Sequence, residues 1–328
     1  MIPILRRAAR FPLVLAPALL LAGAAFAVPA AAQQDDAPDL SFTQDYEPSP
    51  AIWRLADEDT TIYMFGTIHL LPEGFRWRSE RFDTVVAEAE TLVVETSDGD
   101  SPAQMAAVSP KLQADYARSR SISRALSPES RAVWQDFVGA TGAPFEVIDS
   151  MPVMVALMSF AQTMPEDGSS YDYGVETVLE AEFAAAGKPI ESIENFGHIL
   201  YQMYRREEGP LLADLDAQLQ AWSRKPTDPL YPTGEEGETG DAYWAMEHAW
   251  AQGRVQNTFD LGFGDGAIAQ AFEEILLERR NRNWAEWLEN RLDEPGTILL
   301  AVGAGHFEGD VSVLRFLEER GLTAERID

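Results

Sequence analysis

The chain has 328 residues, no cysteine, and 54 acidic against 25 basic side chains, which gives a formal net charge of −29. The absence of cysteine excludes a thiol nucleophile and any metal site built from thiolates. So acidic a protein is not expected to bind nucleic acid or anionic lipid through its overall field.

Residues 1–32 have the pattern of a secretory signal peptide. Arginines near the start precede an apolar stretch from Phe11 to Val28, and a run of small alanines follows it. We expect cleavage after Ala32, or alternatively after Ala27, and therefore an exported protein, periplasmic or secreted, with no stable membrane span. An uncleaved anchor is the alternative, because the stretch approaches the roughly 18 residues that can span a bilayer.

Residues 33–50 are polar and rich in proline, so they are predicted to form a flexible leader before a single domain over residues 51–328. The domain begins with an apolar segment at 51–55. A polar break at 57–60 then predicts a hairpin turn into a buried strand at 61–65.

A strand–helix–strand unit follows. Ser79 is a suitable N-cap for a helix whose apolar positions run from Phe82 to Ala89, and residues 91–95 form the next apolar strand. This order predicts a parallel βαβ unit, in which the strand that ends at Glu95 lies next to the strand before it in the chain.

The middle of the chain is mostly helical. Ser127-Pro128 is a helix start, since an N-cap followed by proline at the first helical position is favoured. Residues 151–164 form an apolar run that is too short for a membrane span and suits a buried helix. Residues 225–241, rich in Pro, Gly, Glu and Thr, are predicted to form an exposed loop.

Periodicity and turn signals predict the remaining elements. These are a helix at 175–186, a strand at 190–194, a long helix at 267–292, a strand at 297–302, a helix at 310–320 and a short strand at 323–327. The predicted fold class is therefore α/β, with a central mixed, partly parallel sheet, flanking helices and a helical insertion.

Two of the four histidines close the same pattern, Gly-x-x-His, at Gly66–His69 and at Gly303–His306. Each pattern follows a predicted buried strand, and the carboxyl ends of strands are where α/β proteins gather ligands and catalytic groups. Neutral imidazole is a common metal ligand and also titrates near neutral pH. We therefore expect the two motif histidines to converge on one site. His198 and His248 have no comparable context and are interpreted as structural.

Charged residues beside these motifs are further candidates. Glu95 ends a predicted strand and could complete a site of two histidines and one carboxylate, or act as a general base. Arg280 could bind an oxyanion or a substrate through its planar guanidinium. Asp172, Glu176 and Glu194 lie near glycines or strand boundaries, but residue type alone does not rank them among so many acids.

Several of these motifs together resemble the TraB/GumN family (TraB/PrgY/GumN), in the same order and at similar spacing over almost the whole domain. The motifs that carry the resemblance are Phe65–His69, the strand ending at Glu95, Gly174–Glu176, Gly187–Ile190 with Glu194, Arg280-Asn281 before Trp284-Ala285, and Val302–His306 with Gly309. The last of these blocks, followed by a helix and a short terminal strand, is the most specific.

The resemblance implies a fold similar to erythromycin esterase and ChaN-like proteins, with both Gly-x-x-His motifs at a shared active centre. The site residues that it implies are the metal ligands His69, Glu95 and His306 and the catalytic residues Glu95, Glu176, Arg280 and Asn281. The family is related to the Tiki proteins, which are metal-dependent proteases.

We expect an exported metal-dependent hydrolase that acts on peptides, with manganese, cobalt or zinc as its divalent ion. The alternative is a non-catalytic protein of the same fold that binds and sequesters a peptide or signal. Metal-independent hydrolysis of an ester is a third possibility, by analogy with the esterase-like fold. In each case the partner is a peptide or a small molecule.

Overall fold

The computed structural model describes residues 39–116, 121–161, 167–224, 230, 238–256 and 262–328. The predicted signal peptide lies outside these residues, as do positions 33–38 of the predicted leader and most of the predicted loop at 225–241. No helix of the described part of the chain combines the length and the apolar character needed to cross a bilayer.

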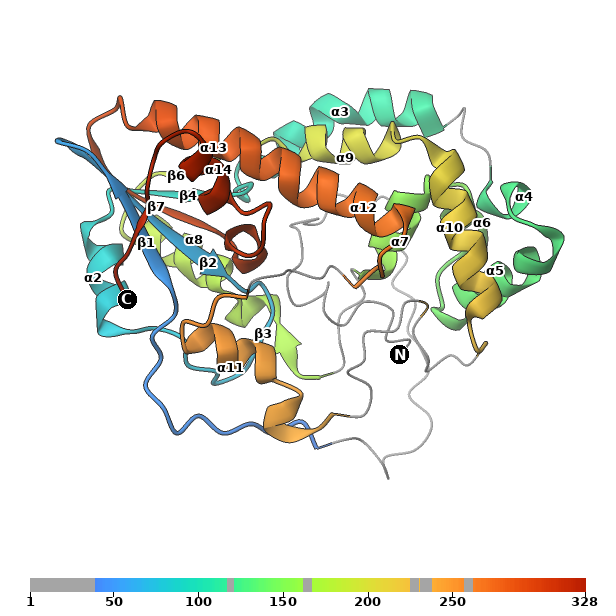
Figure 1. Ribbon diagram of the computed structural model, residues 1–328, viewed down its shortest axis with the longest axis horizontal. Helices are drawn as coiled ribbons and strands as arrows, with labels where there is room; N and C mark the ends of the chain where they lie inside the picture. The colour runs from blue at the N-terminus through green and yellow to red at the C-terminus, as the bar shows by residue number, and fades with distance from the viewer. Residues whose placement is uncertain (1–38, 117–120, 162–166, 225–229, 231–237, 257–261) are drawn as a thin grey trace.

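The core of the fold is a six-stranded sheet with the strand order β6-β4-β7-β2-β1-β8 (Figure 1). Its strands are β1 (Ile52–Ala56), β2 (Thr60–Thr67), β4 (Thr91–Val94), β6 (Ile190–Ser192), β7 (Gly296–Gly303) and β8 (Glu325–Arg326). The four strands from β6 to β2 are parallel, whereas β1 and β8 are antiparallel to their neighbours. The predicted α/β class with a mixed, partly parallel sheet is confirmed.

The hairpin between β1 and β2 forms as predicted, and its turn has a local cause. The side chain of Asp57 accepts hydrogen bonds from the backbone N–H of Asp59 at 3.2 Å and of Thr60 at 2.9 Å. An aspartate that binds backbone groups two and three residues ahead stabilises a turn without help from the rest of the fold.

The prediction that the strand ending at Glu95 lies next to the strand before it in the chain is wrong. Instead of pairing with β2, β4 pairs with β7, and β7 lies between β4 and β2. The inserted strand comes from near the end of the chain, and its residues from Ile298 to Val302 are all buried. The sequence of a parallel strand that is covered on both faces is a continuous apolar run. Such a run does not indicate which strands lie next to it in the sheet.

Successive side chains of each strand point to opposite faces of the sheet. Different helices cover the two faces (Figure 1). The covering helices are α2 (Glu80–Glu88), α8 (Val175–Ala185), α13 (Arg279–Arg291) and α14 (Val313–Glu319). Phe65 and Leu299 belong to the face under α2 and α8, while Met64 and Leu300 belong to the face under α13 and α14. Ser79 caps α2 as predicted, accepting from the N–H of Phe82.

The helical insertion has a hydrophobic core of its own. Its elements are α3 (Ser101–Tyr116), α4 (Ile122–Ala125), α5 (Pro128–Ala140), α6 (Phe145–Asp149), α7 (Val153–Ala161), α9 (Phe196–Tyr204), α10 (Glu208–Ala221) and α12 (Ala267–Phe272). The predicted start at Ser127-Pro128 is confirmed, because Ser127 caps α5. The apolar run after Met151 forms α7, which is almost entirely buried in this core.

The long helix predicted at 267–292 forms one continuous run, with an irregular segment in its middle. Between α12 and α13 lies the π-helical segment η3 (Glu273–Glu278). Such segments change which side chains face the neighbouring elements and are frequent at functional sites. This one ends directly before Arg279 and Arg280.

Residues 39–50, assigned above to the leader, lie against α11 (Ala245–Ala251). The indole N–H of Trp244 donates to the carbonyl of Leu40 at 2.7 Å, and the N–H of Ser49 donates to the carbonyl of Ala251 at 2.8 Å. These contacts join extended backbone to a short helix. They require no periodic pattern of side chains, so the sequence gives no sign of them.

His248 on α11 has a structural environment, as interpreted from the sequence. Its Nδ1 lies 2.7 Å from the hydroxyl of Tyr46, and its ring packs against the rings of Phe42 and Phe75. Burial lowers the pKa of His248, so this histidine is neutral at physiological pH.

Candidate functional site

The two motif histidines lie at the carboxyl ends of adjacent parallel strands. In the register of β2 and β7, Thr67 pairs with Gly303, so each histidine follows its strand by two or three residues. Both side chains are buried. A Cβ atom placed on Gly303 would lie 3.9 Å from Nε2 of His69 and 3.7 Å from Cδ2 of His306. The two imidazoles therefore flank the same backbone position.

The first glycine of each motif is needed for close packing at this junction. A Cβ on Gly66 would lie 2.9 Å from the Cα of Ala304, inside the second motif. A Cβ on Gly303 would lie 3.2 Å from Oε1 of Glu95. Larger residues at these positions would push apart the groups that the two strand ends bring together.

His69 is oriented by a carboxylate from α8. Its Nδ1 lies 2.8 Å from Oε1 of Glu176, and the hydroxyl of Thr67 donates to the same oxygen. Burial disfavours the charged imidazole, but the carboxylate of Glu176 outweighs it and raises the pKa of His69. The Nε2 atom of His69 is buried and has no hydrogen-bond partner among the described residues.

The position of Glu176 depends on a close backbone approach. The N–H of Val175, at the start of α8, donates to the carbonyl of Ile68 at 3.0 Å. A Cβ on Gly174 would lie 2.0 Å from the carbonyl oxygen of His69, so only glycine fits there. The Gly174–Glu176 motif thus presses the start of α8 against the histidine that its glutamate binds.

His306 is oriented by an amide from α13. Its Nδ1 lies 2.6 Å from Oδ1 of Asn281, and Nδ2 of Asn281 donates to the carbonyl of Val311 at 2.7 Å. That second bond directs the amide oxygen towards the imidazole, so Nδ1 is the donor and Nε2 keeps its lone pair. Burial and the nearby guanidinium of Arg280 hold the pKa of His306 well below its ordinary value, which keeps the ring neutral.

Glu95 lies beside His306, with its Oε1 3.7 Å from Nε2 of that histidine. The same Oε1 accepts the N–H of Gly303 at 2.9 Å, and Oε2 accepts from Nη2 of Arg280. Burial opposes ionisation of Glu95, but the guanidinium of Arg280, the imidazole of His69 and this N–H outweigh it and lower the pKa of Glu95 to about 2. Glu95 is therefore a charged, buried carboxylate.

Arg280 is buried with two carboxylates, only one of which its single charge can neutralise. It binds Glu194 through Nε at 2.8 Å and Nη2 at 2.7 Å, and its Nη1 donates to the carbonyl of Leu276 at 2.9 Å. Burial raises the pKa of Glu194, and its bonds with Arg280 offset this only in part. Because its donors are directed at protein groups, Arg280 in this arrangement positions Glu95.

The six residues implied by the family resemblance thus form two linked groups around Gly303: His69 with Glu176, and His306 with Asn281, Glu95 and Arg280. Sequence reasoning gave no role to Thr67 or Trp284 and did not rank Glu194. The indole N–H of Trp284 donates to Glu194 at 3.0 Å, and its ring lies 4.3 Å from that of His306. Thr67 lies inside the first motif and Trp284 in the motif block after Asn281, so position within the motifs was the signal that could have identified them.

The donor chemistry of this site fits a divalent metal ion. Both histidines can present an Nε2 lone pair while an oxygen holds Nδ1, which is the usual arrangement of a metal-bound imidazole. Glu95 is a third possible ligand through Oε1, which it shares with the N–H of Gly303. In the described part of the chain, however, no group of three or more histidine, aspartate or glutamate side chains is gathered closely enough to form a metal site.

Comparison with known proteins gives one finding. The sequence profile of the TraB/PrgY/gumN family matches residues 51–326, from the start of β1 to the end of β8. No curated protein and no solved structure matches the chain. The similarity to erythromycin esterase and ChaN-like folds therefore stays a prediction.

We predict that Gly66→Ala destabilises the fold by about 1–3 kcal/mol, because the new Cβ overlaps the backbone at Ala304. The matched control is Gly209→Ala in α10, where a Cβ meets nothing within 4 Å. That variant should be neutral, or more stable by up to about 1 kcal/mol. Equilibrium unfolding in urea measures both, and equal midpoints for the two variants would contradict the packing argument.

We further predict that Arg280→Met lowers the free energy of unfolding by about 3–5 kcal/mol, because it leaves two buried carboxylates without a cation. Arg279→Met is the control, since the neighbouring Arg279 is exposed and pairs at the surface with Glu274. Its cost should stay below about 1 kcal/mol.

The cost of Arg280→Met should also depend on pH. In the wild type the pKa of Glu95 is lowered from 4.5 to about 2, so its ionised form stabilises the fold above about pH 4.5. That contribution is lost as the pH falls towards 2. The stability difference between wild type and Arg280→Met should therefore shrink between pH 6 and pH 3. A difference that stays constant over this range would exclude the ion pair as its cause.

Proposed function

This chain belongs to the TraB/PrgY/gumN family, and from that premise we propose that it is an exported, metal-dependent hydrolase that acts on peptides. One observation carries the proposal: two buried imidazoles, from motifs 237 positions apart, both flank Gly303 while Glu176 and Asn281 hold their Nδ1 atoms. The buried Nε2 of His69 has no hydrogen-bond partner among the described residues and is therefore available to a ligand.

In this proposal His69, His306 and Glu95 would hold the ion, which would be manganese, cobalt or zinc, because imidazole and carboxylate donors suit all three. When bound, the ion supplies a Lewis acid that polarises a carbonyl and lowers the pKa of water. The guanidinium of Arg280 keeps Glu95 ionised, and therefore able to bind a cation.

Glu176 is the better of the two carboxylates considered as general base. Both oxygens of Glu95 already accept hydrogen bonds, from Gly303 and Arg280. Glu176 uses only Oε1, for His69 and Thr67, and its buried Oε2 has no partner among the described residues. We therefore assign the general base in this proposal to Glu176, through the oxygen that no described residue occupies.

Export is the second part of the proposal and rests on the signal-peptide pattern of residues 1–32. Fractionation of the source cells, with N-terminal sequencing of the mature protein, tests it. A mature chain that begins at Gln33 or Val28 supports export, and an intact N-terminus in the cytoplasm excludes it.

The metal is tested with the full-length mature protein, purified without chelator or histidine tag. We expect wild type to contain a divalent ion and to cleave peptides in a defined mixture, and His69→Ala and His306→Ala to lose both. Asn281→Ala should weaken metal binding by about 10–100-fold, because the orientation of His306 is lost. His198→Ala, at an exposed histidine of α9, is the matched control.

Elemental analysis and mass spectrometry of the peptides measure the two effects separately. Metal content and peptide cleavage in all four variants that equal those of wild type would contradict the proposal. Unmodified peptides that co-purify with the protein would instead support the sequestering alternative. Cleavage that persists in EDTA would support metal-independent hydrolysis.

A further inference from the structure

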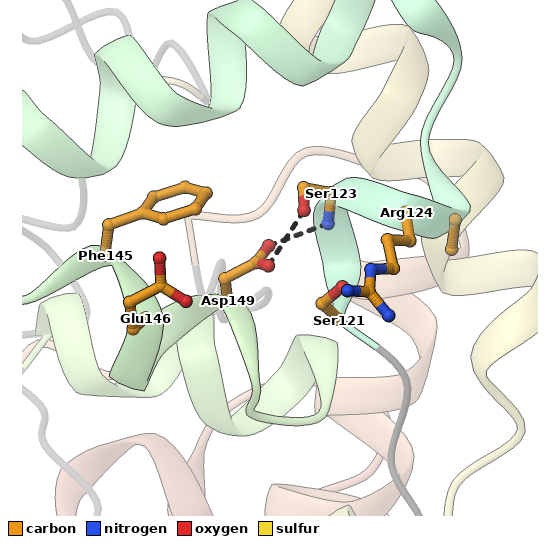
Figure 2. Close-up of a pocket in the computed structure, with 7 residues that line it drawn as sticks. Ser121, Ser123, Arg124, Phe145, Glu146 and Asp149 are labelled. Atoms are coloured by element: carbon orange, nitrogen blue, oxygen red, sulfur yellow. Dashed lines mark hydrogen bonds between the residues drawn. The ribbon is translucent and has the colours of Figure 1, made fainter.

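The helical insertion contains a cavity that takes no part in the histidine site. It has a volume of about 740 Å³ and lies between α4 and α6 (Figure 2). Its lining residues are Ser121, Ser123, Arg124, Ala125, Phe145, Glu146 and Asp149. Cavities of this size hold small organic molecules in other proteins. In Figure 1, α4 and α6 lie at the far side of the insertion from the sheet.

The carboxylate of Asp149 forms a rigid back wall. It accepts hydrogen bonds from the N–H of Ser123 at 2.7 Å, from the hydroxyl of Ser123 at 2.8 Å, and from the indole of Trp134 at 3.0 Å. Its side chain is buried, and these three donors occupy its oxygens. Asp149 therefore holds α4 against α5 and α6 and is not free to bind a ligand.

Two other charges that line the cavity have no partner in the described part of the chain. Neither the guanidinium of Arg124 nor the carboxylate of Glu146 forms an ion pair or a side-chain hydrogen bond with any residue that the structure describes. They come from opposite walls: Figure 2 shows Arg124 with Ser121 on one side of Asp149, and Glu146 with Phe145 on the other. The cavity thus presents a cation and an anion at separate ends.

The side next to Glu146 also offers an apolar surface. Phe145 is half-buried, packs against the core of the insertion, and keeps part of its ring towards the cavity. An aromatic ring beside a free carboxylate suits a ligand whose ammonium group is close to an apolar side chain.

We propose that this cavity binds a short peptide with free termini, of about dipeptide size and with an apolar first side chain. Its terminal carboxylate binds Arg124, whose planar fork accepts a carboxylate through two hydrogen bonds. Its terminal ammonium binds Glu146, and its side chain packs on Phe145. A purely cationic ligand would bring a like charge to Arg124, and a purely anionic one would bring a like charge to Glu146. Only a zwitterion pairs both.

This inference is independent of the proposed function, because the cavity contains neither motif histidine. It names a site for the chemical class of small peptides, whether or not the protein cleaves them.

The test is calorimetric titration of the full mature protein with leucyl-leucine, its N-acetyl derivative and its C-terminal amide. We expect the free dipeptide to bind, and each blocked form to bind at least about tenfold more weakly. In Arg124→Gln the preference for the free dipeptide over the amide should disappear. In Glu146→Gln the preference over the N-acetyl form should disappear. Both side chains are exposed, so neither variant should impair folding.

The matched control is Glu129→Gln, at an exposed acid of α5 outside the cavity, which should bind the free dipeptide as wild type does. Binding that Glu129→Gln weakens as much as the two cavity variants do would overturn the inference. So would a dipeptide that does not bind at millimolar concentration, blocked forms that bind equally well, or preferences that neither cavity variant changes.

Discussion

The parallel pairing of β2 with β7 is the contact on which the rest of the site depends. It brings together two segments that lie 237 positions apart, and its register places Thr67 opposite Gly303. A slip of one residue would turn every side chain of one strand to the other face and separate the two histidines. Because Gly66 has no side chain, Ala304, the first residue after β7, can pack directly against β2. The glycines of the two motifs are thus packing requirements between the motifs themselves.

Much of the fold follows from local patterns, and the part that does not is the order of the strands. The hairpin at Asp57, the cap at Ser79 and the long helix before β7 were all predictable, because each is decided by nearby residues. The position of β7 between β2 and β4 was not predictable, since an apolar run does not indicate which strands it pairs with. The candidate residues were predictable from the motifs, but their partners were not. Arg280, suggested as an oxyanion clamp, is instead directed at Glu95 and Glu194.

Composition was a poor guide to the acids that matter. With 54 acidic residues, the chain gives no reason to separate Glu95, Glu176 and Glu194 from the solvated majority. These three acids differ from the others because each is buried next to a specific donor. Glu95 and Glu194 bind Arg280, and Glu176 binds His69. Burial raises the pKa of Glu194 more than Arg280 lowers it, whereas at Glu95 the effect of Arg280 and its neighbours outweighs burial, so the two pKa values move in opposite directions. The network therefore keeps one buried negative charge beside His306 and reduces the tendency of the other to ionise.

The long helix links this network to the insertion. Leu276 lies in the π-helical segment and packs in the core of the insertion, while its carbonyl accepts a hydrogen bond from Arg280. A few residues later the same helix packs Trp284 and Leu288 against the sheet and holds His306 through Asn281. The helix thus belongs to both hydrophobic cores, and the irregular segment lies where it passes from one to the other. Since Arg280 orients Glu95, the packing of the insertion helps to set the position of a buried carboxylate at the sheet. The insertion is therefore part of the structure that supports the site, although none of the six site residues comes from its own helices α3 to α7.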